Sequence, residues 1–411
     1  MPRPLTLALW LLLLWGCTPA LRVGAPPLPA PWQEPDAYLP GNAVTILATG
    51  GETYEAMQAA IRSAQRHIHV ETYILCDDNI GRALLADLAE RRRAGVEVRI
   101  LYDAQGSHNC TSTAFFEKLE NQGLEIAAYR PASAGPLIYP FYFNRRDHRK
   151  LLIIDGRIAF TGGINFNDVY AATPAISREN EEYWRDTNVQ VEGPAVAAFQ
   201  RLFLEHWRKH RPLPDFPGEV FFPHLPPQGE VAVQLLESEG GARRNPLYET
   251  YLAAFRHASE RIWITQAYLS PEPNLLEALT SAAQRGVDVR LIMPHVSDLP
   301  LLKPMADSTY ETLLSAGVRI YERPNAYMHA KTAVIDGRWS TVGSINLDYR
   351  SLVHNDEVNL LIDGREFAQR MEALFREDLS HSVEIELEQW RQRPLWPRVK
   401  EWLGRLVAYW I

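Results

Sequence analysis

The chain of 411 residues lacks an excess of positive charge, because its formal net charge is -8. Binding to a phosphate backbone normally requires a basic surface, so this balance argues against nucleic acid as a partner. Cysteine is scarce, at three residues. The sequence also lacks a metal-ligand cluster, a glycine-rich phosphate loop and a dinucleotide motif. It therefore predicts no metal and no cofactor.

The N-terminus lacks a hydrophobic run of membrane-spanning length. The apolar segment at 5–15 is too short for a comfortable span and has the length of a signal peptide. It leads into Leu-Trp-Gly-Cys at 14–17, which resembles the lipobox of bacterial lipoproteins. We expect residues 1–17 to be a lipoprotein-type signal peptide with Cys17 lipidated, and residues 18–40 to be a proline-rich tether. The alternative is an uncleaved N-terminal anchor. Either places the protein at the membrane of a bacterial envelope, on the periplasmic side.

The remaining cysteines, Cys76 and Cys110, both follow predicted strand ends. An exported protein reaches a compartment that permits disulfides. A bridge between the two and a pair of free buried thiols are equally compatible with the sequence.

What the sequence does contain is a duplicated motif. His148, Lys150 and Asp155 recur with the same spacing as His329, Lys331 and Asp336. A tail follows each copy: Gly-Gly-Ile-Asn at 162–165 and Gly-Ser-Ile-Asn at 343–346. One copy of such a motif arises by accident in on the order of a few per cent of chains of this length. Two copies with matching tails indicate one site built from two half-sites.

The residue types of the motif suit phosphate chemistry. His and Lys two positions apart project from the same face of a strand. A Lys ammonium binds phosphoryl oxygens as a compact charge, and the tail residues Asn165 and Asn346 offer amide donors. One His cannot both attack phosphorus and protonate a leaving alkoxide in one step, but two can share these roles. The alternative for each His is a satisfied core residue. For Asp155 and Asp336 we favour a role in holding the turn after the strand.

These motifs resemble the phospholipase D superfamily, and more closely its bacterial cardiolipin synthases. The resemblance covers about residues 40 to 411 and includes the strings at 184–187, 191–196 and 390–396. It implies a covalent phosphatidyl-histidine intermediate, with His148 as nucleophile and His329 as acid and later base. It also implies an acidic residue that orients the His of the opposite half. The predicted site comprises His148, Lys150, Asp155, His329, Lys331 and Asp336, supported by Asn165, Asn346, Gly163, Ser344, Asp186 and Glu357.

The repeat extends to the surrounding elements. Strands are predicted at 68–74 and 262–268, each followed by a helix and a second strand, which indicates an α/β fold. We expect two phospholipase D-like repeats, at 41–211 and 229–385, joined by a proline-rich linker at 212–228. Each is a mixed β-sheet flanked by helices, and the two pack with pseudo-twofold symmetry around one active site.

Two further segments have two interpretations each. The apolar, aromatic stretch at 136–146 suits either an acyl-chain path or core packing between the halves. The segment 386–411 is amphipathic and either lies on a membrane or docks on the domain; we favour the membrane because the stripe is Trp-rich and terminal. The stripe consists of Trp396, Val399, Leu403, Leu406 and Trp410.

The resemblance implies a cardiolipin synthase-type phosphatidyltransferase. Such an enzyme moves a phosphatidyl group between two molecules of the anionic lipid phosphatidylglycerol and releases glycerol. We expect it to act as a monomer at a membrane surface. The first alternative is a hydrolytic phospholipase D that releases phosphatidic acid; a nuclease and a non-catalytic lipid-binding lipoprotein are less compatible with the charge and with the intact pair of motifs.

Overall fold

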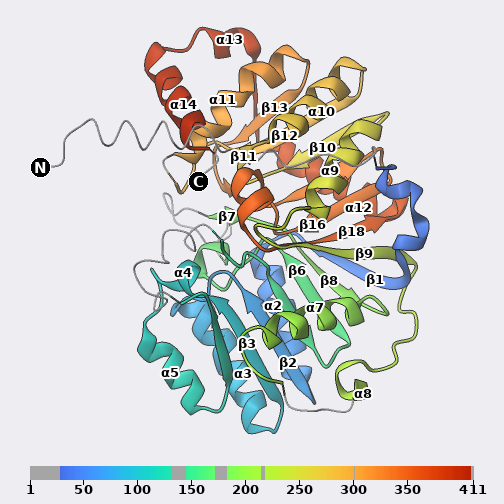
Figure 1. Cartoon of the computed structure of the whole chain (residues 1–411), viewed down its shortest axis with the longest axis vertical. Coiled ribbons are helices and arrows are strands. Elements are labelled where there is room, and N and C mark those ends of the chain that lie inside the picture. Colours follow the sequence, from blue (N-terminus) through green and yellow to red (C-terminus); the bar gives the residue numbers. More distant parts are fainter. Residues whose placement is uncertain (1–27, 132–144, 172–182, 214–217, 300, 409–411) are drawn as a thin grey trace, which may run out of the picture.

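The computed structural model describes residues 28–131, 145–171, 183–213, 218–299 and 301–408. Its two halves, lower and upper in Figure 1, share one continuous sheet of 15 strands. The strand order is β19-β13-β12-β10-β15-β16-β18-β9-β1-β8-β6-β5-β2-β3-β4. From the central β1–β9 pair outward, the two halves run through corresponding strands in the same order. This confirms the predicted α/β fold of two repeats.

The main strands and helices of the two halves follow the same order, and each half adds short elements of its own. The first half consists of β1 (Leu39–Leu47), α2 (Gly50–Ser63), β2 (His67–Thr72), α3 (Asn79–Arg93), β3 (Glu97–Asp103), α4 (Ala104–Ser107), α5 (Thr113–Asn121), β4 (Glu125–Tyr129), β5 (Leu151–Ile154), β6 (Ile158–Gly162), η4 (Asp168–Tyr170), β7 (Trp184–Arg185), β8 (Asn188–Glu192) and α7 (Val196–Arg208). The second half consists of β9 (Val231–Ser238), α9 (Pro246–His257), β10 (Arg261–Thr265), β11 (Leu269–Ser270), α10 (Pro273–Gln284), β12 (Asp288–Pro294), α11 (Leu302–Ser315), β13 (Arg319–Arg323), β14 (Tyr327–Met328), β15 (Thr332–Ile335), β16 (Trp339–Gly343), β17 (Leu347–Asp348), η5 (Arg350–His354), β18 (Glu357–Asp363), α12 (Arg365–Ser380), β19 (Val383–Ile385), α13 (Leu387–Arg391) and α14 (Leu395–Val407).

The motif strand β5 is apolar throughout, and β15 is apolar except for Thr332, because helices cover both faces of the sheet. In β5, Leu151 and Ile153 pack toward α7, while Leu152 and Ile154 pack toward α2 and α3. Only a strand buried on both faces needs such a continuous apolar run. The sheet is mixed, since β2, β3 and β4 pair in parallel and β5 pairs with β2 in antiparallel orientation.

The two halves share a core across their seam. Helices α7 and α12 belong to one apolar cluster, which joins Phe199 and Phe203 of α7 to Met371 of α12 and to Val358 and Leu360 of β18. This shared packing and the β1–β9 pairing join the halves into one body. The loops that carry the two motifs are therefore held in one place relative to each other.

Residues of the predicted tether 18–40 and of the predicted linker 212–228 pack against the folded halves. Trp32 and Tyr38 contact the second half, where the Trp339 indole donates to the Tyr38 hydroxyl at 2.8 Å. Phe221, in the short helix α8 (Gly218–Phe221), is buried against the His67 and His69 rings. The predicted signal peptide 1–17, including Cys17, lies outside the described residues.

Two further observations concern cysteine and the membrane. Cys76 and Cys110 form a disulfide, which joins the loop after β2 to the loop after α4. Among the described helices, none combines the length and the apolar character needed to cross a membrane.

Candidate active site

Each motif histidine is placed by a short parallel pairing between the halves. Asp147 pairs with Asp356, and the His148 amide donates to the Asp356 carbonyl at 2.9 Å. In the same way β14 pairs with β7, and the His329 amide donates to the Arg185 carbonyl at 2.8 Å. The residue after each carbonyl is acidic. Each His therefore lies beside an acidic residue of the opposite half.

These pairs form two histidine–carboxylate dyads. The Nδ1 atom of His148 lies 2.9 Å from Oε2 of Glu357, and Nδ1 of His329 lies 2.6 Å from Oδ2 of Asp186. A neutral imidazole that donates from Nδ1 keeps Nε2 as the nitrogen available for chemistry. Both dyads therefore present an oriented ring that can either attack or transfer a proton.

The second residue of each tail contacts the carboxylate of its own half. The Ser344 hydroxyl donates to Glu357 at 2.5 Å. Gly163 occupies the equivalent position, where an added Cβ would lie 2.3 Å from Oδ1 of Asp186. The carboxylate of Asp186 therefore approaches the backbone closely, and this approach needs glycine. The sequence alone does not show that Ser344 donates a hydrogen bond to its carboxylate whereas Gly163 leaves room for one.

The histidines of both dyads line one pocket of about 440 Å³. The tail residues Asn165 and Asn346 line the same pocket, and Oδ1 of Asn346 is buried without a hydrogen-bond partner among the described residues. A phosphate diester would meet two imidazoles and two carboxamides here. The structure thus brings the histidine and the tail asparagine of both copies to a single cavity.

Aromatic rings form much of the pocket wall, and the sequence reasoning did not assign them to the site. The Tyr73 ring lies 5.0 Å from that of His148, and the Trp184 ring lies 4.9 Å from that of His329. A signal was available, because Tyr73 and Tyr268 belong to the matched segments 68–74 and 262–268. The aromatic lining comprises Tyr73, Tyr170, Trp184 and Tyr268.

The motif lysines are buried next to the histidines. The Lys150 ammonium donates to the His148 carbonyl at 2.6 Å, and Nζ of Lys331 lies 2.9 Å from Nδ1 of His329. Burial lowers the pKa of Lys150 to about 7 and that of Lys331 to about 8, against the opposing effects of Glu357 and Asp186. A bound anion would favour the charged ammonium forms, which matches a site for phosphate.

The motif aspartates hold turns at the far end of the strands. Asp155 accepts backbone N–H bonds from Gln65, Arg66 and His67 at 2.7–2.9 Å. Asp336 accepts the equivalent bonds from residues 259–261 at 2.8–3.0 Å. Both have positive φ angles and neither lines the pocket. This geometry supports the turn-holding role and gives them no contact with the reacting groups.

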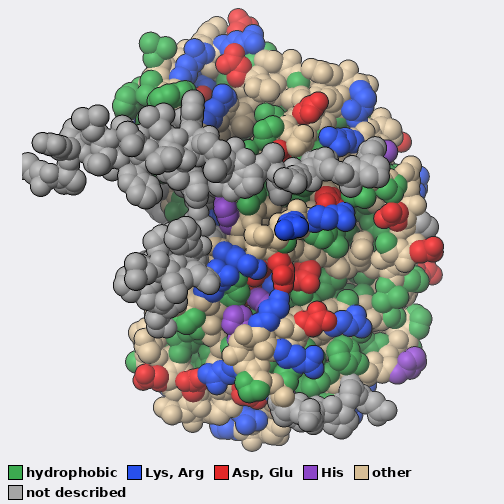
Figure 2. Space-filling model, viewed as in Figure 1, with side chains coloured by type: hydrophobic (Ala, Val, Ile, Leu, Met, Phe, Trp, Pro, Cys, Tyr) green, Lys and Arg blue, Asp and Glu red, His purple; other side chains and the backbone are tan. Residues whose placement is uncertain are grey.

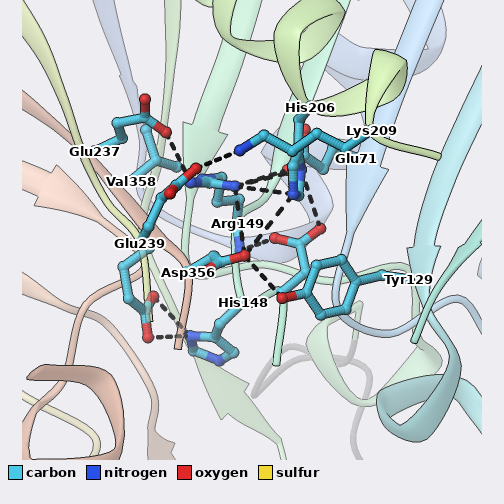
Figure 3. A network of polar contacts seen from close by, with 12 residues as sticks. Glu71, Tyr129, His148, Arg149, His206, Lys209, Glu237, Glu239, Asp356 and Val358 are labelled. Carbon is cyan, nitrogen blue, oxygen red and sulfur yellow. Dashed lines mark hydrogen bonds and ion pairs between the residues drawn. The ribbon is translucent and has the colours of Figure 1, made fainter. Parts of the chain in front are cut away.

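A buried polar cluster lies next to His148 (Figure 3), and the sequence did not predict it. Arg149 lies at its centre, 2.7 Å from Glu237 and 3.3 Å from Nδ1 of His206. His206 in turn lies 2.8 Å from Glu71, and Tyr129 donates to Asp356 at 2.9 Å. The chain neighbours of His148 and Glu357 are members of this cluster. We infer that it fixes the backbone on both sides of the first dyad.

The same region contains the one candidate for cation binding found among the described residues. Glu71, Asp147 and His206 present ligand atoms within 4.8 Å of one another. The Arg149 guanidinium, however, lies 3.7 Å from Glu71 and already supplies a positive charge there. We assign this cluster to structural support of the motif rather than to a metal.

The arginines that end the predicted aromatic stretch are ion-paired. Arg145 lies 3.6 Å from Asp356, and Arg146 lies 3.6 Å from Asp103. The rest of that stretch, residues 136–144, lies outside the described residues. Its proposed role as an acyl-chain path stays a prediction.

Comparisons with known proteins identify the family of the chain. The family model described as cardiolipin synthase, PLD-like domain, matches residues 57–207 and 251–379. The chain is 34% identical to a cardiolipin synthase of Geobacillus kaustophilus over 88% of its own length and 71% of the relative's. It is 33% identical to the major cardiolipin synthase of Bacillus subtilis, over 89% and 75%. The crystal structure of a phosphatidylserine synthase from Haemophilus influenzae covers 91% of the chain with a TM-score of 0.69 at 16% identity, which supports the fold. The chain therefore belongs to the cardiolipin synthase family of the phospholipase D superfamily.

Proposed function

We propose that this protein is a cardiolipin synthase that transfers a phosphatidyl group from one phosphatidylglycerol to another and releases glycerol. The observation that carries the proposal is the pair of dyads whose histidines line one pocket, each dyad assembled from both halves of the chain. One dyad supplies a nucleophile and the other supplies an acid and base. Exchange of one phosphodiester for another needs no nucleotide energy.

The reaction follows from the two available Nε2 atoms. Nε2 of His148 attacks phosphorus and the bond to the glycerol oxygen breaks, while His329, protonated on both ring nitrogens at this stage, donates its Nε2 proton to that oxygen and becomes neutral. A phosphatidyl-histidine then remains on His148. In the second step His329 takes a proton from the glycerol hydroxyl of another phosphatidylglycerol, whose oxygen attacks phosphorus. The bond to His148 breaks and cardiolipin leaves.

The environments of the dyads support this division of roles. Burial lowers the pKa of His148 to about 4, so its ring is neutral and nucleophilic near neutral pH. Burial opposes ionisation of Glu357, but His148 and Lys150 outweigh it and hold the pKa of Glu357 below its usual value. Burial raises the pKa of Asp186 to about 6 despite Lys331. Burial, Lys331 and Lys150 lower the pKa of His329 well below its usual value, so the bound phosphate diester anion is needed to favour the imidazolium that acts as the acid.

Product analysis distinguishes transfer from hydrolysis. Purified protein is incubated with vesicles that contain phosphatidylglycerol labelled in the terminal glycerol and in the acyl chains. We expect one glycerol to be released for each cardiolipin formed. Phosphatidic acid as the main lipid product would instead identify a hydrolytic phospholipase D and contradict the proposal.

We further propose that one chain at the periplasmic face of a membrane suffices for activity. Both histidines, both lysines and both orienting carboxylates are contained in the same chain, which supports action as a monomer. The lipobox-like string at 14–17 supports a membrane-attached lipoprotein. An unmodified Cys17 in the mass spectrum of the mature N-terminus would contradict the lipoprotein assignment.

Gly163→Ala is expected to lower kcat by roughly 10- to 100-fold. The added methyl would collide with the Asp186 carboxylate, which must then move away from His329. Ser344→Gly is the matched variant, because it removes a side chain at the equivalent tail position and leaves space. It should cost less, since Glu357 keeps its contact with His148. Steady-state kinetics and thermal unfolding of both variants check this, and equal losses would contradict the steric account.

A further inference from the structure

Helix α14 exposes a stripe of large apolar side chains among those that the structure describes. Trp396 and Trp402 are 65% and 60% exposed, whereas Gly404 and Ala408 are buried. Gly404 lies so close to α11 that an added Cβ would be 3.0 Å from Cγ of Met305. Among the described side chains, α11 is contacted by Gly404, by Ala408 and by Arg405, whose guanidinium donates to the Ser308 carbonyl, while the hydrophobic stripe faces solvent. Figure 2 shows these hydrophobic side chains gathered at the upper left, over α14. The α14 stripe consists of Leu395, Trp396, Val399, Trp402 and Leu403.

A second group of exposed apolar residues precedes α11. Val296, Leu299 and Leu301 are each about half exposed, at 52%, 49% and 48%. The next residues of α11, Leu302 and Met305, form an apolar cluster with Ala408 at the end of α14. Leu299 and Leu302 also line the active-site pocket. The α14 stripe and this loop are therefore connected through α11, beside the pocket.

The charge of α14 complements an anionic surface. The helix contains Arg398, Lys400 and Arg405 but only one acidic residue, Glu401. Glu401 lies 2.9 Å from Arg393 of the preceding turn, and the guanidinium balances its negative charge. An exposed stripe of Trp and Leu flanked by basic side chains is the pattern of helices that lie in a lipid interface. Soluble monomers rarely expose such a stripe without a partner.

We propose that the α14 stripe, together with Val296, Leu299 and Leu301, is the surface by which the enzyme docks on a bilayer of anionic phospholipid. Docking there places the pocket beside the headgroups, so that a lipid reaches His148 and His329 without leaving the membrane completely. This inference rests on the proposed function in one respect: the substrate is taken to be a membrane lipid.

A fluorescent label at Val399 tests the contact directly. The full-length chain with Cys17→Ala is used, so that an introduced cysteine is the free thiol beside the Cys76–Cys110 disulfide. Val399→Cys carries an environment-sensitive dye and is mixed with vesicles of equal parts phosphatidylglycerol and phosphatidylcholine. We expect a blue-shifted emission that brominated lipid quenches. The matched control is Leu39→Cys on β1, where exposure is similar, 46% against 43%, and no response is expected.

A second variant measures how much the stripe contributes. Trp396→Ser combined with Trp402→Ser should weaken vesicle binding roughly tenfold in a flotation assay. No response at position 399, or equal responses at positions 399 and 39, would overturn the proposal. Neither readout requires turnover. A chain that docks through position 399 but forms no cardiolipin would contradict the proposed function and leave the docking surface intact.

Discussion

Replacement of either His148 or His329 by alanine is expected to reduce cardiolipin formation by at least about 10³-fold. The two rings perform different steps on the same phosphorus, and each is oriented by its own carboxylate. Neither can replace the other, because one must be bonded to phosphorus while the other moves the proton. The double variant should therefore be no worse than either single variant, as expected for groups that act as a unit.

His295→Ala is a suitable control for the histidine variants. This imidazole is exposed, lies 2.8 Å from Glu322 and is not part of the pocket. Its loss should leave transfer within about twofold of the parent protein. The rate is measured with labelled phosphatidylglycerol under identical vesicle conditions. Near-normal transfer by either active-site variant would show that the two-histidine mechanism is wrong.

Glu357→Gln and Asp186→Asn are each expected to lower kcat by on the order of 10²- to 10⁴-fold. Each substitution keeps the shape of the side chain but replaces a carboxylate that accepts a hydrogen bond from Nδ1. At His148 the new amide can donate to Nδ1 instead, which moves the imidazole proton to Nε2 and blocks attack by that atom. At His329 the loss of the carboxylate removes the negative charge that stabilises the imidazolium. Glu357→Gln also weakens the hydrogen bond from Ser344.

The control for the carboxylate variants is Glu237→Gln. This residue belongs to the polar cluster of Figure 3 and contacts Arg149 at 2.7 Å, but its side chain is 41% exposed and does not touch His148. It should affect kcat by less than about threefold. Thermal unfolding checks that all three variants fold. If Glu357→Gln retained the parent kcat while folded, the carboxylate would have no role in orienting His148.

The dyad partners were accessible from the sequence because the chain repeats itself. Two copies of the motif and two acidic residues after them imply one shared site, and the family resemblance assigns Asp186 and Glu357 to the opposite histidines. Alternation of strands and helices likewise sufficed for the α/β fold. The polar cluster was not accessible, because Arg149, Glu71 and His206 meet only where α7 crosses β2 and β5.

Other features depend on how helices and loops are oriented in the folded chain, and sequence patterns do not give this orientation. Periodicity identifies the apolar stripe of α14, but it does not tell whether the stripe faces α11 or solvent. The structure shows that Gly404 makes the inner contact and Trp402 faces outward. The sequence positions of Cys76 and Cys110 are compatible with two free thiols and with a disulfide. The disulfide depends on how the loop after β2 meets the loop after α4. The aromatic wall of the pocket similarly depends on rings from both halves.

Trapping of the covalent intermediate tests the central claim most directly. The parent protein is mixed with labelled phosphatidylglycerol, quenched rapidly under conditions that preserve phosphohistidine, and digested for mass spectrometry. The account predicts a phosphatidyl group on His148 and none on His329, with the modification absent from His148→Ala. A modification found only on His329 would reverse the roles of the two dyads, and turnover without any histidine adduct would contradict the mechanism.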